Sequence, residues 1–130
     1  RGYSMEITSS WLNLPVTNLE KSEAFYKAIG FEIKKSNEMI DKMRGIATSD
    51  NKVIMLIETE QFKKVSKLAD IGSNEAIISL SVRSNAEVDA LLDLVVSANG
   101  KVLERGTSHE GFYGGLFSDI DGHLYNVIAM

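Results

Sequence analysis

The sequence contains no cysteine, one proline, one tryptophan and two histidines in 130 residues. Without cysteine the chain has no disulfide, no thiolate metal ligand and no cysteine nucleophile, which fits a reducing cytoplasm. It also lacks an apolar run near the roughly 20 residues of a membrane-spanning helix, and it has no signal-peptide core near its start. The net charge is −4 and the pI about 5.2. Because nucleic acids and anionic membranes bind clustered Lys and Arg, neither is expected as a partner.

Hydrophobic residues make up 44% of the chain, which is enough to bury the core of one domain. We expect that domain to span residues 5–130. Residues 1–4 precede Met5, a plausible initiator, and are interpreted as a cloning remnant.

Leu14 to Phe31 has the pattern of a strand followed by an amphipathic helix. Asn18 is an N-cap type, because its side chain can accept a hydrogen bond from a free backbone N–H of the first turn. Apolar residues then recur at helical spacing, and Gly30 is suited to the left-handed conformation that ends a helix. The segment therefore predicts strand, helix and strand.

The whole chain predicts two tandem β-α-β-β-β modules. Module 1 covers about 7–59, a linker with a helix covers about 60–72, and module 2 covers about 75–130. The predicted strands are 7–16, 31–35, 43–48 and 52–58, then 76–82, 101–105, 112–118 and 123–129, with helices from 19, from 60 and over 85–98. Leu14 and Leu80 are 66 residues apart and Gly30 and Gly100 are 70 apart, so the second helix gains about one turn.

The segments LPVTNLEKSEAFYKAIGFEI and DIDGHLYNVI, with the paired modules, resemble the vicinal oxygen chelate superfamily of glyoxalases, extradiol dioxygenases and bleomycin-resistance proteins. The resemblance implies an α+β fold with a cup-shaped, mixed or mostly antiparallel sheet, helices outside and a homodimer. It also implies a divalent metal at four inward positions. These positions map onto Trp11, Met55, Ile77 and Asn126.

Those four residues predict that no metal or other cofactor is bound. Indole, thioether and aliphatic groups are not ligands for the divalent ions of this superfamily, and Asn126 offers only one neutral oxygen. An apolar cleft with a few polar groups is expected instead. Its candidate ligand-binding residues on one face of the strands are Trp11, Asn13, Met55, Ile77, Ser79 and Asn126. The alternative is a packed core that closes the cleft.

Four further candidates lie outside this set. Arg44 and Tyr113 occupy related positions in the repeat and are predicted to contact the ligand. Arg44 would bind a carboxylate or phosphate of the ligand; the alternative for Arg44 is a surface charge. His109 and Glu110 lie in a glycine-rich stretch that predicts a loop over the cleft, where they are candidates for acid–base catalysis. The alternative is an exposed polar loop. His123 is expected in a solvated turn.

These features favour a metal-independent protein that binds a small, partly aromatic or apolar compound in a homodimer. The alternative is a glyoxalase- or dioxygenase-like enzyme with an atypical site, or a metal-independent isomerase that uses His109 and Glu110. A structural dimer with a filled cleft is the third possibility.

Overall fold

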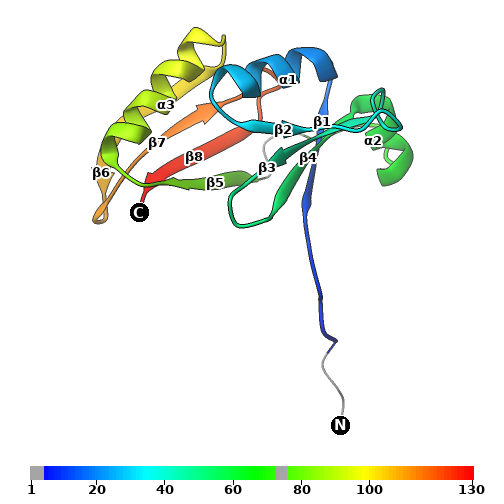
Figure 1. The fold of residues 1–130 in the computed structure, drawn as a ribbon, viewed down its shortest axis with the longest axis horizontal. Helices are drawn as coiled ribbons and strands as arrows, with labels where there is room; N and C mark the ends of the chain where they lie inside the picture. The colour runs from blue at the N-terminus through cyan, green and yellow to red at the C-terminus, as the bar shows by residue number, and fades with distance from the viewer. Residues whose placement is uncertain (1–4, 73–75) are drawn as a thin grey trace.

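Each half of the chain forms its own four-stranded sheet, as a computed structural model describing residues 5–72 and 76–130 shows (Figure 1). The predicted start of module 2 at about residue 75 and the predicted remnant 1–4 lie outside the described residues. The elements are β1 (Leu12–Val16), α1 (Leu19–Ala28), β2 (Glu32–Lys34), β3 (Met43–Ala47), β4 (Val53–Glu58), α2 (Thr59–Ser66), β5 (Ile77–Val82), α3 (Asn85–Ser97), β6 (Lys101–His109), β7 (Phe112–Ser118) and β8 (Leu124–Ala129).

The two sheets repeat one topology. The first sheet has the order β1-β4-β3-β2 and the second has the order β5-β8-β7-β6. In each sheet the first strand runs parallel to the last one, and the remaining pairs are antiparallel. The predicted α+β fold of two β-α-β-β-β modules with mixed sheets is therefore confirmed.

Polar side chains cap the starts of α1 and α3, the first of them as predicted. The Asn18 side chain accepts a hydrogen bond from Lys21 N at 2.9 Å, and Ser84 accepts one from Glu87 N at 3.2 Å. Helix α3 has 13 residues and α1 has 10, close to the extra turn that the repeat spacing predicts. Gly30 has φ +93°, the left-handed conformation expected at the end of α1.

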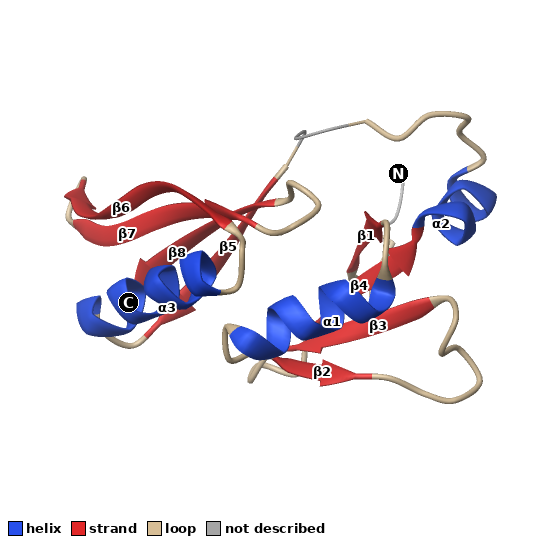
Figure 2. Cartoon of the chain, turned by 90° about the horizontal axis from the view of Figure 1, so that it is seen from above, coloured by secondary structure: helices blue, strands red, loops and turns tan. Residues whose placement is uncertain are grey.

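The helix-covered faces of both sheets join in one hydrophobic core. Its members include Leu14, Ile46 and Leu56 of module 1 and Leu92 and Val127 of module 2. Figure 2 shows α1 and α3 next to each other. Because one face of each sheet is used in this shared core, the opposite face of each sheet is left open.

A buried polar network links the modules inside this core. The Tyr26 hydroxyl of α1 donates to the Asp119 carboxylate and lies 2.7 Å from the Tyr125 hydroxyl. Both tyrosines are 0% exposed and Asp119 is 4% exposed. Burial raises the pKa of Tyr26, Tyr125 and Asp119.

The turn between β7 and β8 also forms hydrogen bonds with module 1. Asp121 accepts hydrogen bonds from the Thr17 backbone and hydroxyl at 3.2 and 2.9 Å and from the Ser22 hydroxyl at 3.3 Å. The His123 ring Nε2 lies 2.6 Å from the carbonyl oxygen of Pro15. His123 is therefore half-buried in a contact between modules, which corrects the expectation of a solvated turn residue.

Two local predictions are wrong. The predicted strand 7–16 is shortened to Leu12–Val16, because the ladder with β4 begins only at Leu12 and Ile54. Residues 5–11 form an exposed segment that leads away from the sheets (Figure 1). The predicted loop around His109 is instead the end of the β6–β7 hairpin. Glu110 and Gly111 both have positive φ, which matches a tight two-residue hairpin turn.

In the described part of the chain, none of the helices has the length and apolar content needed to cross a membrane.

Candidate functional site

The open face of the first sheet carries two of the predicted ligand-binding residues. Alternation along β1 and β4 places Asn13 beside Met55, its register partner, on the face opposite the core residues Leu14 and Leu56. Trp11 precedes β1 and is 63% exposed.

Trp11 and Met55 border one cavity of about 520 Å³. Its remaining walls come from the N-terminal segment and from the β3–β4 turn, so a mixed polar and apolar surface surrounds the indole. Asn13 lies instead in a separate cavity of about 270 Å³ with Pro15 and His123. Asn13 and its register partner Met55 therefore line different cavities.

The open face of the second sheet holds a cavity of about 390 Å³. Register pairs Ser79 with Asn126 on this face, and Ile77, also on it, is 57% exposed. The cavity is lined by Glu104, Thr107, His109, Glu110, Phe112, Gly114, Gly115, Asn126 and Ile128.

This cavity gathers three of the predicted site residues, namely His109, Glu110 and Asn126. Glu104, which sequence reasoning missed, adds a second carboxylate. It follows an irregular stretch of β6 where the ladder register shifts, so simple alternation does not predict its face. An imidazole, two carboxylates and an amide can together exchange a proton with a bound molecule and orient it. Phe112 and Ile128 supply apolar walls.

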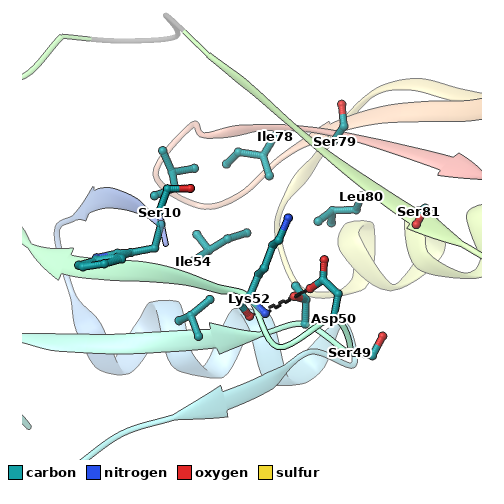
Figure 3. A pocket seen from close by; sticks show the side chains of 13 residues that line it. Ser10, Ser49, Asp50, Lys52, Ile54, Ile78, Ser79, Leu80 and Ser81 are labelled. Atoms are coloured by element: carbon teal, nitrogen blue, oxygen red, sulfur yellow. Dashed lines mark hydrogen bonds between the residues drawn. The ribbon is translucent and has the colours of Figure 1, made fainter. Parts of the chain in front are cut away.

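The largest of these cavities, about 620 Å³, lies between β1 and β4 of the first sheet and β5 of the second (Figure 3). Strands β1 and β5 each form one edge of their sheet. Trp11 and Ser79, both predicted ligand-binding residues, line this cavity together. Its other walls are Ser10, Leu12, Thr48, Ser49, Asp50, Lys52, Val53, Ile54, Ile78, Leu80 and Ser81.

The structure places Arg44 away from all of these cavities, which corrects its predicted role as a ligand contact. Arg44 lies on the same face of β3 as the core residue Ile46, two residues along the strand, and is only 2% exposed. Its Nε donates to Glu23 at 2.8 Å, and one terminal nitrogen donates to the carbonyl oxygens of Ile40 and Met43 at 2.6 and 3.0 Å. Its guanidinium therefore fixes α1 on the first sheet.

Tyr113 is likewise on the helix-covered side of its sheet. Its hydroxyl donates to Asp89 of α3 at 2.7 Å. The same hydrogen bond raises the pKa of Tyr113. The prediction that Tyr113 contacts the ligand is therefore wrong, because the pleat directs residue 113 toward α3 rather than toward the open face.

The four positions implied for a metal do not fit one. They hold an indole, a thioether, an alkyl group and one amide, and of these only the amide oxygen of Asn126 is a ligand for a hard cation. Met55 and Asn126 also border different cavities. In residues 5–72 and 76–130, no three His, Asp or Glu side chains are grouped so that they could hold a metal ion.

Comparison with known proteins agrees with this architecture. A family model described as bleomycin resistance protein-like N-terminal matches residues 8–49. A hypothetical protein from S. aureus is 43% identical, with 97% of this chain and 96% of that chain covered and a TM-score of 0.88. A glyoxalase-related enzyme from Fulvimarina pelagi is 20% identical, with 95% and 88% covered and a TM-score of 0.82. A lactoylglutathione lyase from Agrobacterium tumefaciens is 16% identical, with 96% of each chain covered and a TM-score of 0.68.

The search of curated proteins finds no match. Taken together, the repeated modules, the family match and these structural relatives show that the chain belongs to the vicinal oxygen chelate superfamily, the glyoxalase and bleomycin-resistance family of folds. Its 43% identical relative is described only as a hypothetical protein, and the relatives with named activities share the fold at 20% identity or less.

Proposed function

We propose that this protein binds a small, partly aromatic molecule and that it does so without a metal ion. The observation that carries the proposal is the replacement of the metal-ligand positions by Trp11, Met55 and Ile77 on open sheet faces, with Trp11 bordering two cavities. Their volumes of about 620 and 520 Å³ lie in the range of roughly 300–1,000 Å³ typical of small-molecule sites.

Trp11 is the proposed main contact. Its ring is rigid and flat, and its exposure of 63% leaves a surface on which a planar molecule can stack. Ser79, which lines the larger cavity with Trp11, offers a hydroxyl for orientation.

A homodimer is part of the proposal. Trp11, Ile77 and Phe112 are 63%, 57% and 52% exposed, and exposed apolar side chains of this size on open sheet faces favour association. A second copy of the chain seated on these faces would cover the cavities and keep water from the ligand. Sedimentation at micromolar concentration tests this part: a dimer is expected, and a monomer would contradict it.

A thermal-shift screen of aromatic compounds, run in excess EDTA, tests the binding proposal. A ligand raises the melting temperature through mass action, and the effect should persist with the chelator present. Trp11→Ala should remove most of the shift, and Val65→Ala, an equally exposed apolar change on α2, should leave it intact. Shifts that disappear in EDTA, or that survive Trp11→Ala unchanged, would contradict the proposal.

A second candidate function is metal-independent acid–base catalysis, favoured by the grouping of His109, Glu110 and Glu104 around one cavity. Any substrate found in the screen can be tested for isomerisation with His109→Gln and Glu110→Gln. If both variants bind the compound as the natural protein does but convert it at least tenfold more slowly, the site is catalytic. If the natural protein and both variants convert the compound at the same rate, or if none of them converts it, binding remains the function.

A further inference from the structure

Lys52 gives the 620 Å³ cavity a positive charge beside its apolar wall. It lies in the turn that joins β3 to β4, and Figure 3 shows its side chain extending toward Ile78 and Leu80 of the opposite wall. Among the described residues, Lys52 Nζ forms no ion pair within 4.0 Å, whereas Lys27, Lys34 and Lys35 all do.

Asp50 is the one carboxylate in this lining, and its bonding is directed back into its own turn. Its Oδ1 accepts hydrogen bonds from the Thr48 hydroxyl and from Lys52 N, the latter at 3.2 Å. These contacts lower the pKa of Asp50, the Thr48 bond most. Asp50 therefore shapes the turn from which Lys52 extends; the charge of Lys52 also lowers the pKa of Asp50, but the Lys52 ammonium group forms no ion pair with it.

Hydroxyl groups and apolar side chains complete the wall around Lys52. Ser79 and Ser81 share the face of β5 opposite Leu80 and also line the cavity, while Ile54 and Leu80 supply apolar contact. An ammonium group without an ion-pair partner in the described part of the chain is suited to an oxyanion, and the apolar wall and the indole of Trp11 are suited to a ring.

We infer that the ligand of this cavity carries an acidic group, a carboxylate or another oxyanion, which Lys52 binds while the aromatic part of the ligand lies on Trp11, Ile54 and Leu80. This inference rests on the proposed function, because it names the chemical class of the molecule that the same site takes.

Two fluorescent dyes that share one ring system separate the charge from the rings. 8-Anilino-1-naphthalenesulfonate carries a sulfonate, and N-phenyl-1-naphthylamine is the same skeleton without it. Each is titrated against the natural protein, with energy transfer from Trp11, the only tryptophan, reporting that the dye is bound, and the Lys52 variant reporting whether it is bound at the cavity. The control variant is Lys101→Met, which removes an exposed lysine on β6, the strand at the opposite edge of the second sheet from β5 and outside the cavity lining.

Lys52→Met should weaken the binding of the sulfonate dye about fivefold and leave the affinity for the neutral dye within about twofold, since one partly exposed charge contact is removed. Lys101→Met should change neither. Asp50→Asn, which keeps the acceptor of the turn but removes its negative charge, should strengthen the sulfonate dye. Opposite effects of the Lys52 and Asp50 variants would not arise from general damage to the turn.

Other results overturn the inference in distinguishable ways. If Lys52→Met leaves the sulfonate dye unchanged, or weakens both dyes equally, the acidic-group assignment is wrong while aromatic binding stands. If neither dye shows energy transfer from Trp11 in the natural protein, the proposed binding function fails as well.

Discussion

Replacing Tyr26 by phenylalanine should destabilise the protein more than any other change of a single oxygen atom in the core. The Tyr26 hydroxyl makes two buried contacts across the modules, with the Asp119 carboxylate and with the Tyr125 hydroxyl. A hydrogen bond to a charged group contributes roughly 1.5–3 kcal/mol and a neutral one about 1 kcal/mol. Asp119 keeps two backbone donors, from Asp121 and His123 at 2.9 Å each, which limits the loss. We expect a total cost of about 2–3 kcal/mol.

The matched control is Tyr125→Phe, which removes only the contact between the two hydroxyls. It should cost about 1 kcal/mol, because Tyr26 can still donate to Asp119. Denaturant unfolding measures both free energies, and the melting temperature of Tyr26→Phe should fall by roughly 10 °C for a domain of this size. The reasoning would be refuted if Tyr26→Phe lay within about 0.5 kcal/mol of the natural protein, or if Tyr125→Phe cost more.

Three other predictions concern the scaffold. Glu23→Gln should destabilise the protein at pH 7 by about 1–2 kcal/mol, because the carboxylate pairs with the buried Arg44. Hydrogen bonds from Lys27, Lys35 and Arg44 lower the pKa of Glu23 from 4.5 to about 2. Its stabilisation is thus present above pH 4.5 and lost as the pH falls toward 2, so unfolding curves of the two proteins should converge over that interval; a constant difference would contradict the pairing. Burial raises the pKa of Asp119, so its ionisation opposes folding as pH rises above 3.8. Asp119→Asn should then lose less stability than the natural protein between pH 4 and 7, as measured by melting temperature. Gly100→Ala should cost about 1–3 kcal/mol, because its new Cβ would lie 2.7 Å from the Phe25 ring and 2.8 Å from Val95; unchanged stability would show that these side chains move freely.

The fold could be predicted because its signals are local. Asn18 and Ser84 each cap a helix three residues before the backbone donor they bind, so a short window of sequence contains the whole interaction. Alternation along β1 and β5 is equally local, and it correctly separated Leu14 and Val16 from Asn13 and Ser79. The repeat spacing then linked the two halves.

The grouping of the site residues could not be predicted from such signals. The cavities depend on how the two sheets sit relative to each other, and that is decided by contacts such as Tyr26 with Asp119, which are 93 residues apart in the chain. Lys52 and Glu104 therefore escaped notice, one in a turn and the other beside a register shift.

The prediction for Arg44 failed for a different reason. Its position on the strand indicated the buried face, but a charged residue type favoured an exposed one. It is two residues from Ile46 of the core on the same strand, so its position on the helix-covered face could be deduced. A buried arginine is uncommon, however, and its partner Glu23 lies on what appears from sequence to be the polar side of α1.

The metal content of the purified protein is the most direct test of the proposal that this scaffold binds its ligand without a metal ion. The protein would be incubated with excess Mn²⁺, Ni²⁺ or Zn²⁺, dialysed against buffer and measured by elemental mass spectrometry. We predict far less than one ion per chain for each metal and no change in melting temperature. One tightly retained ion per chain, with a raised melting temperature, would contradict the account.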